Sequence, residues 1–390
     1  MKTVSFFDHI GEENAFAVLA RATALAAQGN DVINLGIGQP DFPTPAHIVE
    51  AGMKALRDGH HGYTPANGTL ACREAVVRRT MALTGVEVSP ENVMVTPGGK
   101  PAMFAAIMLF GEPGSEIMYP DPGFPIYRSM IEATGATPVP IPIREENSFA
   151  FSAVEALALI TDKTRLVIIN SPANPTGGVT PRSELNEFVA GLERWPSVAV
   201  LSDEIYDVMT YDNTGHTSLL TYPSVRDRLI VLNGWSKTWA MTGWRIGWSI
   251  WPNALIDNVR KLAVNCWSCV NASAQFAGIA AIDGPQDDVD AMMRAFDERR
   301  LFVDQRLKGM SGLSAILPAG AFYTFLNVRE TGWRAKELAS ALLEEVGVAM
   351  IGGPDFGVLG EGYVRLSYAS SLENIERACD RIETFVQAKH

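Results

Sequence analysis

Short runs of consecutive apolar residues recur through the middle of the chain, separated by longer amphipathic segments. Five such runs are predicted to be buried strands: Val93–Thr96, Glu116–Tyr119, Leu166–Asn170, Val198–Ser202 and Leu229–Asn233. The segments between them have apolar residues at helical spacing, as in the helix that Thr180 can cap and Pro181 can open. Continuous apolar strands that alternate with helices are typical of a mostly parallel sheet covered on both faces. The pattern therefore predicts an α/β fold.

The pattern changes after about residue 285, where a charged helical stretch ends the alternation of strands and helices. Two further strands, Ala321–Asn327 and Tyr363–Ser367, and a helix near Ala335–Val346 are predicted beyond it. This part is predicted to be a smaller α+β domain. We expect residues 41–284 to form the large domain, and residues 1–40 and 285–390 to form the small one.

The composition narrows the class of protein. The 390 residues are 47% hydrophobic, which is enough for a large core. The formal net charge of −12 argues against a nucleic-acid partner, because phosphate binding needs concentrated Lys and Arg. No apolar run has the length of a membrane span, and the first residues lack a signal peptide's apolar stretch. We expect a cytoplasmic protein with no membrane partner. Cys266 and Cys269 lack a second ligand pair, so no metal is expected.

Candidate chemistry collects just after the predicted strands, where ligands bind in open α/β sheets. After the first strand, Gly98 and Gly99 precede a predicted helix whose unpaired N–H groups can receive an anion. After the fourth strand stand Asp203 and, three residues on, Tyr206. Taken alone, the glycines also fit an ordinary turn, and the aspartate fits a helix cap.

The segment after the fifth strand carries one lysine, Lys237, in aromatic surroundings. Its neighbours in sequence include Trp235, Trp239, Met241 and Trp244. A lysine in an apolar environment has a lowered pKa and can act as an amine nucleophile towards carbonyls. A solvated surface lysine is the ordinary alternative, which the density of aromatic residues disfavours.

Four blocks resemble the markers of one family, in the same order along the chain. The run Ser236–Gly247 resembles the lysine signature of the class I/II aminotransferases, the fold-type-I pyridoxal-phosphate enzymes that include aspartate aminotransferase. The blocks Asn174–Gly178, Ser202–Tyr206 and Tyr363–Tyr368 resemble the family's other markers. The resemblance spans roughly residues 34–370.

The resemblance implies a large cofactor-binding domain whose seven-stranded sheet is mostly parallel, with one antiparallel strand. It also implies a ping-pong transfer of an amino group between an L-amino acid and a 2-oxo acid, with pyridoxal 5'-phosphate as cofactor.

The resemblance assigns the catalytic groups. Lys237 would form the Schiff base with the cofactor. Once displaced by the substrate amine, it would shuttle the proton between the substrate α-carbon and the cofactor C4′. Asp203 would pair with the pyridinium nitrogen and keep the ring an electron sink. Tyr206 and Asn174 would hydrogen-bond the phenolic oxygen of the ring.

The cofactor phosphate would be held by the backbone N–H groups of Gly99 and Lys100, the Ser236 hydroxyl and the Arg245 guanidinium. In this interpretation the charge of Lys100 is incidental. Arg245 begins the apolar run Ile246–Trp251 instead of ending one. That strand therefore has to run antiparallel to the others if Arg245 is to reach the same edge of the sheet.

The remaining contacts concern the ring face and the substrate. Phe124 would stack on the pyridine ring, with Tyr127 as a rival for that place. Arg365 would bind the substrate α-carboxylate as a bidentate fork, assisted by Gly38 and Asn174. Because Gly38 and Arg365 belong to the predicted small domain, carboxylate binding would draw that domain inward.

Tyr63 matches a family tyrosine that crosses to the phosphate of the neighbouring subunit. The resemblance therefore implies a homodimer with two-fold symmetry and shared active sites. A turn tyrosine with a local partner is the alternative.

Two other classes of protein fit the sequence less well. A nucleotide-binding loop fails, because Pro101 follows Lys100 and Met94 stands where the first loop glycine is needed. Gly36–Asp41 lacks the third glycine of a dinucleotide fingerprint. A regulator that senses pyridoxal phosphate needs an additional DNA-binding segment, which the acidic composition disfavours.

A β-lyase or another C–C or C–S lyase on the same scaffold remains the alternative activity, because it uses the same lysine, aspartate and arginine. The sequence also leaves the amino donor open. Phe16, Ile37 and Trp267 are apolar candidates for contact with an aromatic or aliphatic side chain. Aspartate, aromatic and broad-range aminotransferases all fit.

Overall fold

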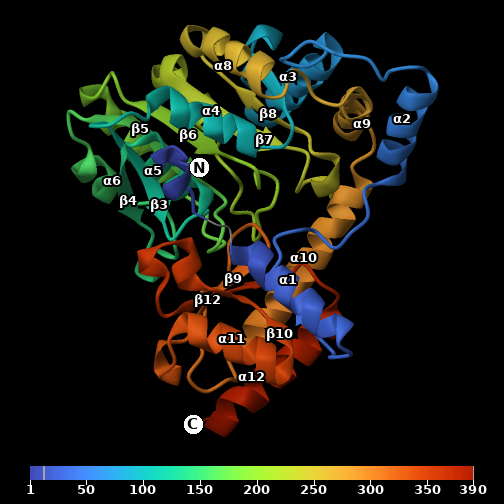
Figure 1. Cartoon of the computed structure of the whole chain (residues 1–390), viewed down its shortest axis with the longest axis vertical. Helices are drawn as coiled ribbons and strands as arrows, with labels where there is room; N and C mark the ends of the chain where they lie inside the picture. Colours follow the sequence, from blue (N-terminus) through green and yellow to red (C-terminus); the bar gives the residue numbers. More distant parts are fainter. Residues whose placement is uncertain (12–13, 390) are drawn as a thin grey trace.

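The computed structural model describes residues 1–11 and 14–389 and contains one large sheet in the upper half of Figure 1. Its seven strands lie in the order β2-β8-β7-β6-β5-β3-β4. Their bounds are β2 Val93–Thr96, β3 Glu116–Asp121, β4 Thr137–Pro142, β5 Thr164–Asn170, β6 Ala199–Asp203, β7 Leu229–Gly234 and β8 Gly247–Ile250. Only β8 runs antiparallel to its neighbours in this sheet, β2 and β7. The predicted sheet, including its one antiparallel strand after Arg245, is confirmed.

Helices cover both faces of this sheet, which explains why the middle residues of its inner strands are apolar on both faces. On β5, Val167 and Ile169 face one core cluster, whereas Leu166 and Ile168 face another. The first cluster includes residues of α2 Ala46–Arg57, α3 Leu70–Thr84, α6 Ala153–Leu159, α7 Arg182–Gly191 and α9 Ala272–Asp283. The second includes residues of α4 Lys100–Phe110, α5 Ile126–Thr134 and α8 Asn253–Cys266.

A smaller α+β assembly forms the lower half of Figure 1, as predicted. Its antiparallel sheet has the order β11-β12-β9, and β1 pairs with β10 in a separate parallel ladder. The strands are β1 Ile33–Asn34, β9 Tyr323–Asn327, β10 Val348–Ala349, β11 Ile351–Gly352 and β12 Tyr363–Ser367. The helices are α1 Asn14–Ala27, α10 Asp287–Leu307, α11 Ala335–Val346 and α12 Leu372–Lys389.

The start of the chain touches both halves. The short 3-10 helix Ser5–Asp8 packs on α5 of the large sheet, and the Gly11 backbone N–H donates to Ser129 Oγ at 2.8 Å. By contrast, α1 contacts β10 and β11. The division at residues 41 and 285 stays a prediction.

Among the described residues, no helix is both long and apolar enough to cross a membrane.

One local prediction is wrong. The helix after Thr180 begins at Arg182, and Pro181 occupies its cap position without a capping side chain. The Thr180 backbone N–H instead donates to Ser171 Oγ at 2.9 Å, which ties the helix start to the end of β5.

Candidate active site

A cavity of about 460 Å³ lies where the ends of the central strands meet the smaller assembly. The register aligns Asn170 of β5 with Asp203 of β6, and Gly234 of β7 with Gly247 of β8. The sites predicted from separate parts of the sequence therefore converge. The predicted residues that line the cavity are Gly38, Gly99, Lys100, Phe124, Asn174, Asp203, Tyr206, Ser236, Lys237, Arg245 and Arg365. Tyr63 does not line it.

Lys237 extends from the turn after β7 into the cavity. Its Nζ donates to the Gly38 carbonyl oxygen at 2.5 Å and lies 5.8 Å from the ring centroid of Phe322. The aromatic contact of the amine comes from another residue than expected, because the neighbouring indoles belong to the core. Trp235 and Trp239 are buried, and their indole nitrogens donate to groups outside the cavity. The apolar contact of the amine comes from Phe322, far along the chain.

Asp203, at the end of β6, has a buried carboxylate with two donors. Tyr127 Oη donates to Oδ2 at 2.7 Å, and the Ile205 backbone N–H donates to Oδ1 at 3.3 Å. Burial raises the pKa of Asp203 to about 6, although both hydrogen bonds lower it. The sequence predicts Tyr127 only as a rival of Phe124 for stacking. The structure shows it as the donor to Asp203, and its ring meets Phe124 edge-on at 5.8 Å.

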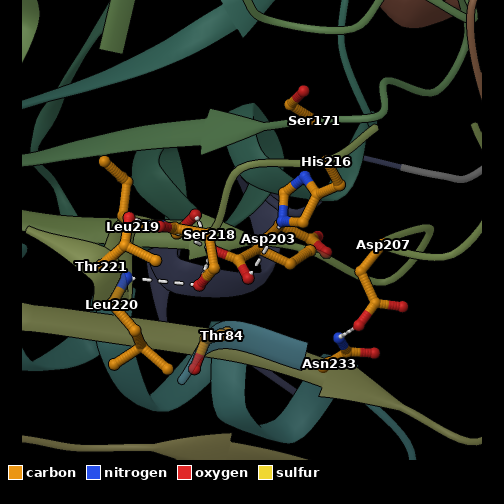
Figure 2. Close-up of polar contacts among 12 residues, drawn as sticks. Thr84, Ser171, Asp203, Asp207, His216, Ser218, Leu219, Leu220, Thr221 and Asn233 are labelled. Carbon is orange, nitrogen blue, oxygen red and sulfur yellow. Dashed lines mark hydrogen bonds and ion pairs between the residues drawn. The ribbon is translucent and has the colours of Figure 1, made fainter. Parts of the chain in front are cut away.

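A polar network whose residues do not line the cavity surrounds the turn after β6. Figure 2 shows His216, Asp207 and Asn233 around this turn. The carboxylate of Glu204, next to Asp203, lies 3.2 Å from His216 Nε2. Asn233 donates to Asp207 at 2.8 Å. Because these contacts anchor the residues after β6, they hold Asp203 in place through the backbone.

The start of α4 forms a cradle for an anion. Gly98 has φ +86°, and a Cβ there would collide with the guanidinium of Arg245. Gly99 occupies the cap position and Lys100 is the first residue of the helix. Both line the cavity, so the N-terminal end of α4, with its unpaired backbone N–H groups, lies at the cavity. Arg245 reaches this edge because β8 is antiparallel. Ser236 lines the same cavity.

Arg365 enters the cavity from β12. Its Nη1 donates to Asn174 Oδ1 at 2.8 Å, and its Nη2 donates to the Gly36 carbonyl at 2.5 Å. The guanidinium carbon lies 4.6 Å from the ring centroids of both Tyr323 and Phe356. A cation with two terminal nitrogens is therefore held in a fixed orientation, as bidentate carboxylate binding requires.

Tyr206 has a partner that sequence reasoning missed. Its Oη lies 2.8 Å from Tyr323 Oη, and both side chains line the cavity. Burial raises the pKa of Tyr206 well above its ordinary value. Tyr323 lies at the start of a predicted strand, but nothing local marked its side chain as part of the site.

The side chain of Lys100 also lies at the cavity, beside two aromatic rings. Its Nζ lies 5.8 Å from the ring centroid of Phe16 and 5.4 Å from that of Phe124. Ile37 also lines the cavity. Trp267 does not, and it packs against the core cluster of α4, α5 and α8.

These groups fit pyridoxal 5'-phosphate. The glycine cradle with Arg245 suits a phosphate dianion, and Lys237 offers an amine to an aldehyde. The raised pKa of Asp203 indicates a buried carboxylate that a protonated ring nitrogen would stabilise. Fold and site together define a pyridoxal-phosphate enzyme of fold type I.

Comparisons with known proteins agree with this class of enzyme. The family model described as "Aminotransferase class I and II" matches residues 30–382. The aspartate aminotransferase of Geobacillus stearothermophilus is 37% identical over 96% of each chain. Aromatic-amino-acid aminotransferase 2 of Thermococcus litoralis is 36% identical over 93% of this chain and 94% of its own. The solved structure of an aspartate aminotransferase from Rhizobium meliloti superposes with a TM-score of 0.94 at 31% identity, covering 99% of both chains. The chain belongs to the class I and II aminotransferases.

It is therefore a pyridoxal-phosphate-dependent aminotransferase, which moves an amino group between an amino acid and a 2-oxo acid. The lyase alternative is not favoured, because full-length relatives are named as aspartate or aromatic aminotransferases.

Proposed function

We propose that Lys237 binds the cofactor covalently and then acts as the base that moves the proton at the substrate α-carbon. The observation that carries this is the convergence of Lys237, Asp203 and Arg365 on one cavity. When bound, pyridoxal phosphate withdraws electrons from the substrate α-carbon. Lys237 Nζ, hydrogen-bonded to the Gly38 carbonyl at the cavity wall, is a primary amine suited to accept that proton.

The other groups would position the ring and its phosphate. Asp203 would hold the proton on the ring nitrogen, with Tyr127 fixing the carboxylate. Tyr206 and Asn174 would meet the phenolic oxygen, and Phe124 would cover the ring face. The backbone N–H groups of Gly99 and Lys100, with Ser236 and Arg245, would hold the phosphate.

Arg365 would bind the substrate α-carboxylate. Its present acceptors, Asn174 Oδ1 and the Gly36 carbonyl, hold the guanidinium in place while it faces the cavity. Gly38 lines the same wall, where its lack of a side chain leaves room for Tyr323. Because Arg365 lies on β12 of the smaller assembly, carboxylate binding would pull this assembly towards the large sheet.

The proposal is tested by incubating the holoenzyme with L-amino acid donors and a 2-oxo acid. Formation of the new amino acid and the new 2-oxo acid in equal amounts is expected. Release of ammonia in place of the new amino acid would show a lyase, and would overturn this assignment.

We further propose that the donors include acidic amino acids. Lys100 supplies a cation to the cavity beside Phe16 and Phe124, so it can meet a second carboxylate on the substrate. Several relatives are named aspartate aminotransferase, which agrees with this chemistry. The apolar wall that includes Phe16 and Ile37 is compatible with aromatic donors, as one relative's name indicates.

Replacing Lys100 with methionine is expected to raise the KM for aspartate, relative to that for phenylalanine, by roughly 10- to 100-fold. The reason is the loss of one charge-assisted hydrogen bond to the second carboxylate. Lys100→Arg keeps the cation and serves as the matched control. Steady-state kinetics with both donors measure the ratio, and an unchanged ratio in Lys100→Met would refute this role.

We also propose that the active form is a homodimer with shared sites, working in the cytoplasm. Tyr63 lies between α2 and α3, is 95% exposed in the single chain and does not line its own cavity. Tyrosine side chains are usually at least partly buried, so such high exposure is unusual. A partner subunit would cover the Tyr63 ring. Its hydroxyl would reach the partner's phosphate.

Tyr63→Phe is expected to weaken cofactor binding about tenfold, because one hydrogen bond to a charged phosphate is lost. The dissociation constant is measured by titrating cofactor-free protein, with Tyr222→Phe as a control at a phenol remote from the cavity. A mixed dimer of Tyr63→Ala and Lys237→Ala chains separates the two arrangements. A shared site leaves one intact site per mixed dimer and restores turnover at low cofactor concentration. No recovery would mean that Tyr63 serves its own chain.

A further inference from the structure

Tyr323 touches three parts of the site at once. It is the first residue of β9, is 1% exposed and lines the cavity. Its hydroxyl lies 2.8 Å from that of Tyr206, and the two rings meet edge-on at 5.9 Å. A Cβ on Gly38 would collide with this hydroxyl, so the glycine leaves the space that Tyr323 fills. The Arg365 guanidinium lies over its ring, 4.6 Å from the centroid.

The hydrogen bond between two phenols has a direction that matters. Each phenol has one hydrogen, so whichever tyrosine donates must direct its hydrogen at the other. A guanidinium over the face of Tyr323 withdraws electron density from that ring and strengthens its O–H as a donor. Tyr206 then accepts from Tyr323 and keeps its own hydrogen for another partner. Because accepting a hydrogen bond polarises a hydroxyl, Tyr206 becomes the stronger donor in turn.

We propose that Tyr323 is a positioning residue of the transamination site: it donates to Tyr206 Oη and thereby aims the Tyr206 hydrogen at the phenolic oxygen of the cofactor. The inference rests on the proposed role of Tyr206. It adds a relay from Arg365, on the substrate carboxylate side, through Tyr323 to Tyr206, on the cofactor side.

The test removes one oxygen atom. In Tyr323→Phe the ring under Arg365 and the edge-on packing stay, and only the hydroxyl is lost. Tyr206 then donates less strongly to the negatively charged oxygen, so the bound cofactor holds its proton to higher pH. The pH midpoint of the cofactor's visible absorbance is expected to rise by roughly half a unit to one unit. The kcat is expected to fall roughly threefold to tenfold, with little change in the KM for the amino donor.

Tyr206→Phe separates failure of this inference from failure of the proposed function. It is expected to raise the midpoint further than Tyr323→Phe, and Tyr323→Phe is expected to add nothing in the Tyr206→Phe background. If Tyr206→Phe leaves the midpoint unchanged, the proposed role of Tyr206 fails. If Tyr206→Phe raises it and Tyr323→Phe does not, only the inference fails. A raised KM with an unchanged midpoint in Tyr323→Phe would also overturn it, because the hydroxyl would then meet the substrate.

Tyr211→Phe is the matched control for a purely structural effect. Tyr211 is a buried phenol of the same core cluster as Tyr323, and its hydroxyl donates to the Ala321 carbonyl at 2.6 Å. Its ring lies 4.6 Å from the Arg300 guanidinium carbon, and it does not line the cavity. Loss of this hydroxyl is expected to lower stability as much as the loss at Tyr323, while leaving the absorbance midpoint in place. Equal midpoint shifts in both variants would refute the relay.

Discussion

Replacing Lys237 with alanine is expected to lower kcat at least about a thousandfold, while the cofactor phosphate stays bound. The variant loses the amine proposed to move the α-proton, and general base catalysis alone contributes on this scale. The proposed phosphate cradle at the start of α4 and at Arg245 does not involve the Lys237 side chain. Turnover with an amino donor and a 2-oxo acid, and the dissociation constant of the cofactor, are the two measurements.

The covalent role of Lys237 has a separate check. Borohydride treatment of the holoenzyme, followed by peptide mapping, is expected to place the reduced cofactor on Lys237 and on no other lysine. The exposed Lys163 serves as the control, since Lys163→Ala is expected to leave both turnover and adduct formation unchanged. A Lys237→Ala variant that keeps wild-type turnover would remove the basis of the proposed mechanism.

The fold could be predicted from the sequence because both faces of the large sheet are buried. The middle residues of strands such as β5 alternate between two core clusters, so they form a continuous apolar run that stands out from the helices. The direction of β8 followed from where Arg245 stands relative to its apolar run. The cap of α7 was missed because Thr180 and Pro181 both suit a helix start, and only tertiary contacts chose between them.

The site was predictable wherever its residues follow a strand or belong to a motif. Lys237, Asp203 and Arg365 are of this kind, and the structure brings them to one cavity. Contacts between distant segments were not predictable. Tyr127 and Asp203 are 76 residues apart, and Tyr206 and Tyr323 are 117 apart. The surroundings of Lys237 were misjudged for the same reason, because neighbours in sequence on a turn point to different sides.

Replacing Asp203 with asparagine is expected to lower kcat by about a hundredfold to a few thousandfold. The neutral amide cannot balance a positive charge on the ring nitrogen, and removing one member of a buried charge pair carries a cost of this order. Asparagine keeps the size of the side chain. Its one oxygen can accept from the Ile205 N–H, and its amide NH2 then faces the Tyr127 hydroxyl, which can accept a hydrogen bond. Steady-state kinetics measure the loss, with the exposed Asp162→Asn as control. Wild-type kcat in Asp203→Asn would contradict the proposed ion pair.

The same substitution is expected to stabilise the cofactor-free protein at neutral pH. Burial raises the pKa of Asp203 from 3.8 to about 6, so between these values the folded state keeps a proton that the unfolded state has lost. The free energy of unfolding therefore falls as pH rises through this window and stays lower above it. Asparagine does not titrate, so Asp203→Asn is expected to gain about 2 to 3 kcal/mol over the unsubstituted protein at pH 8, by the linkage relation. The gain is expected to shrink towards zero near pH 4.

Urea unfolding of both cofactor-free proteins between pH 4 and pH 8 measures this gain. A pH-independent difference would show that Asp203 is already charged in the folded chain. The charged carboxylate is thus expected to lower the free energy of unfolding of the cofactor-free protein. A positive charge on the ring nitrogen of the bound cofactor is expected to restore it, so cofactor binding and folding stability are linked through Asp203.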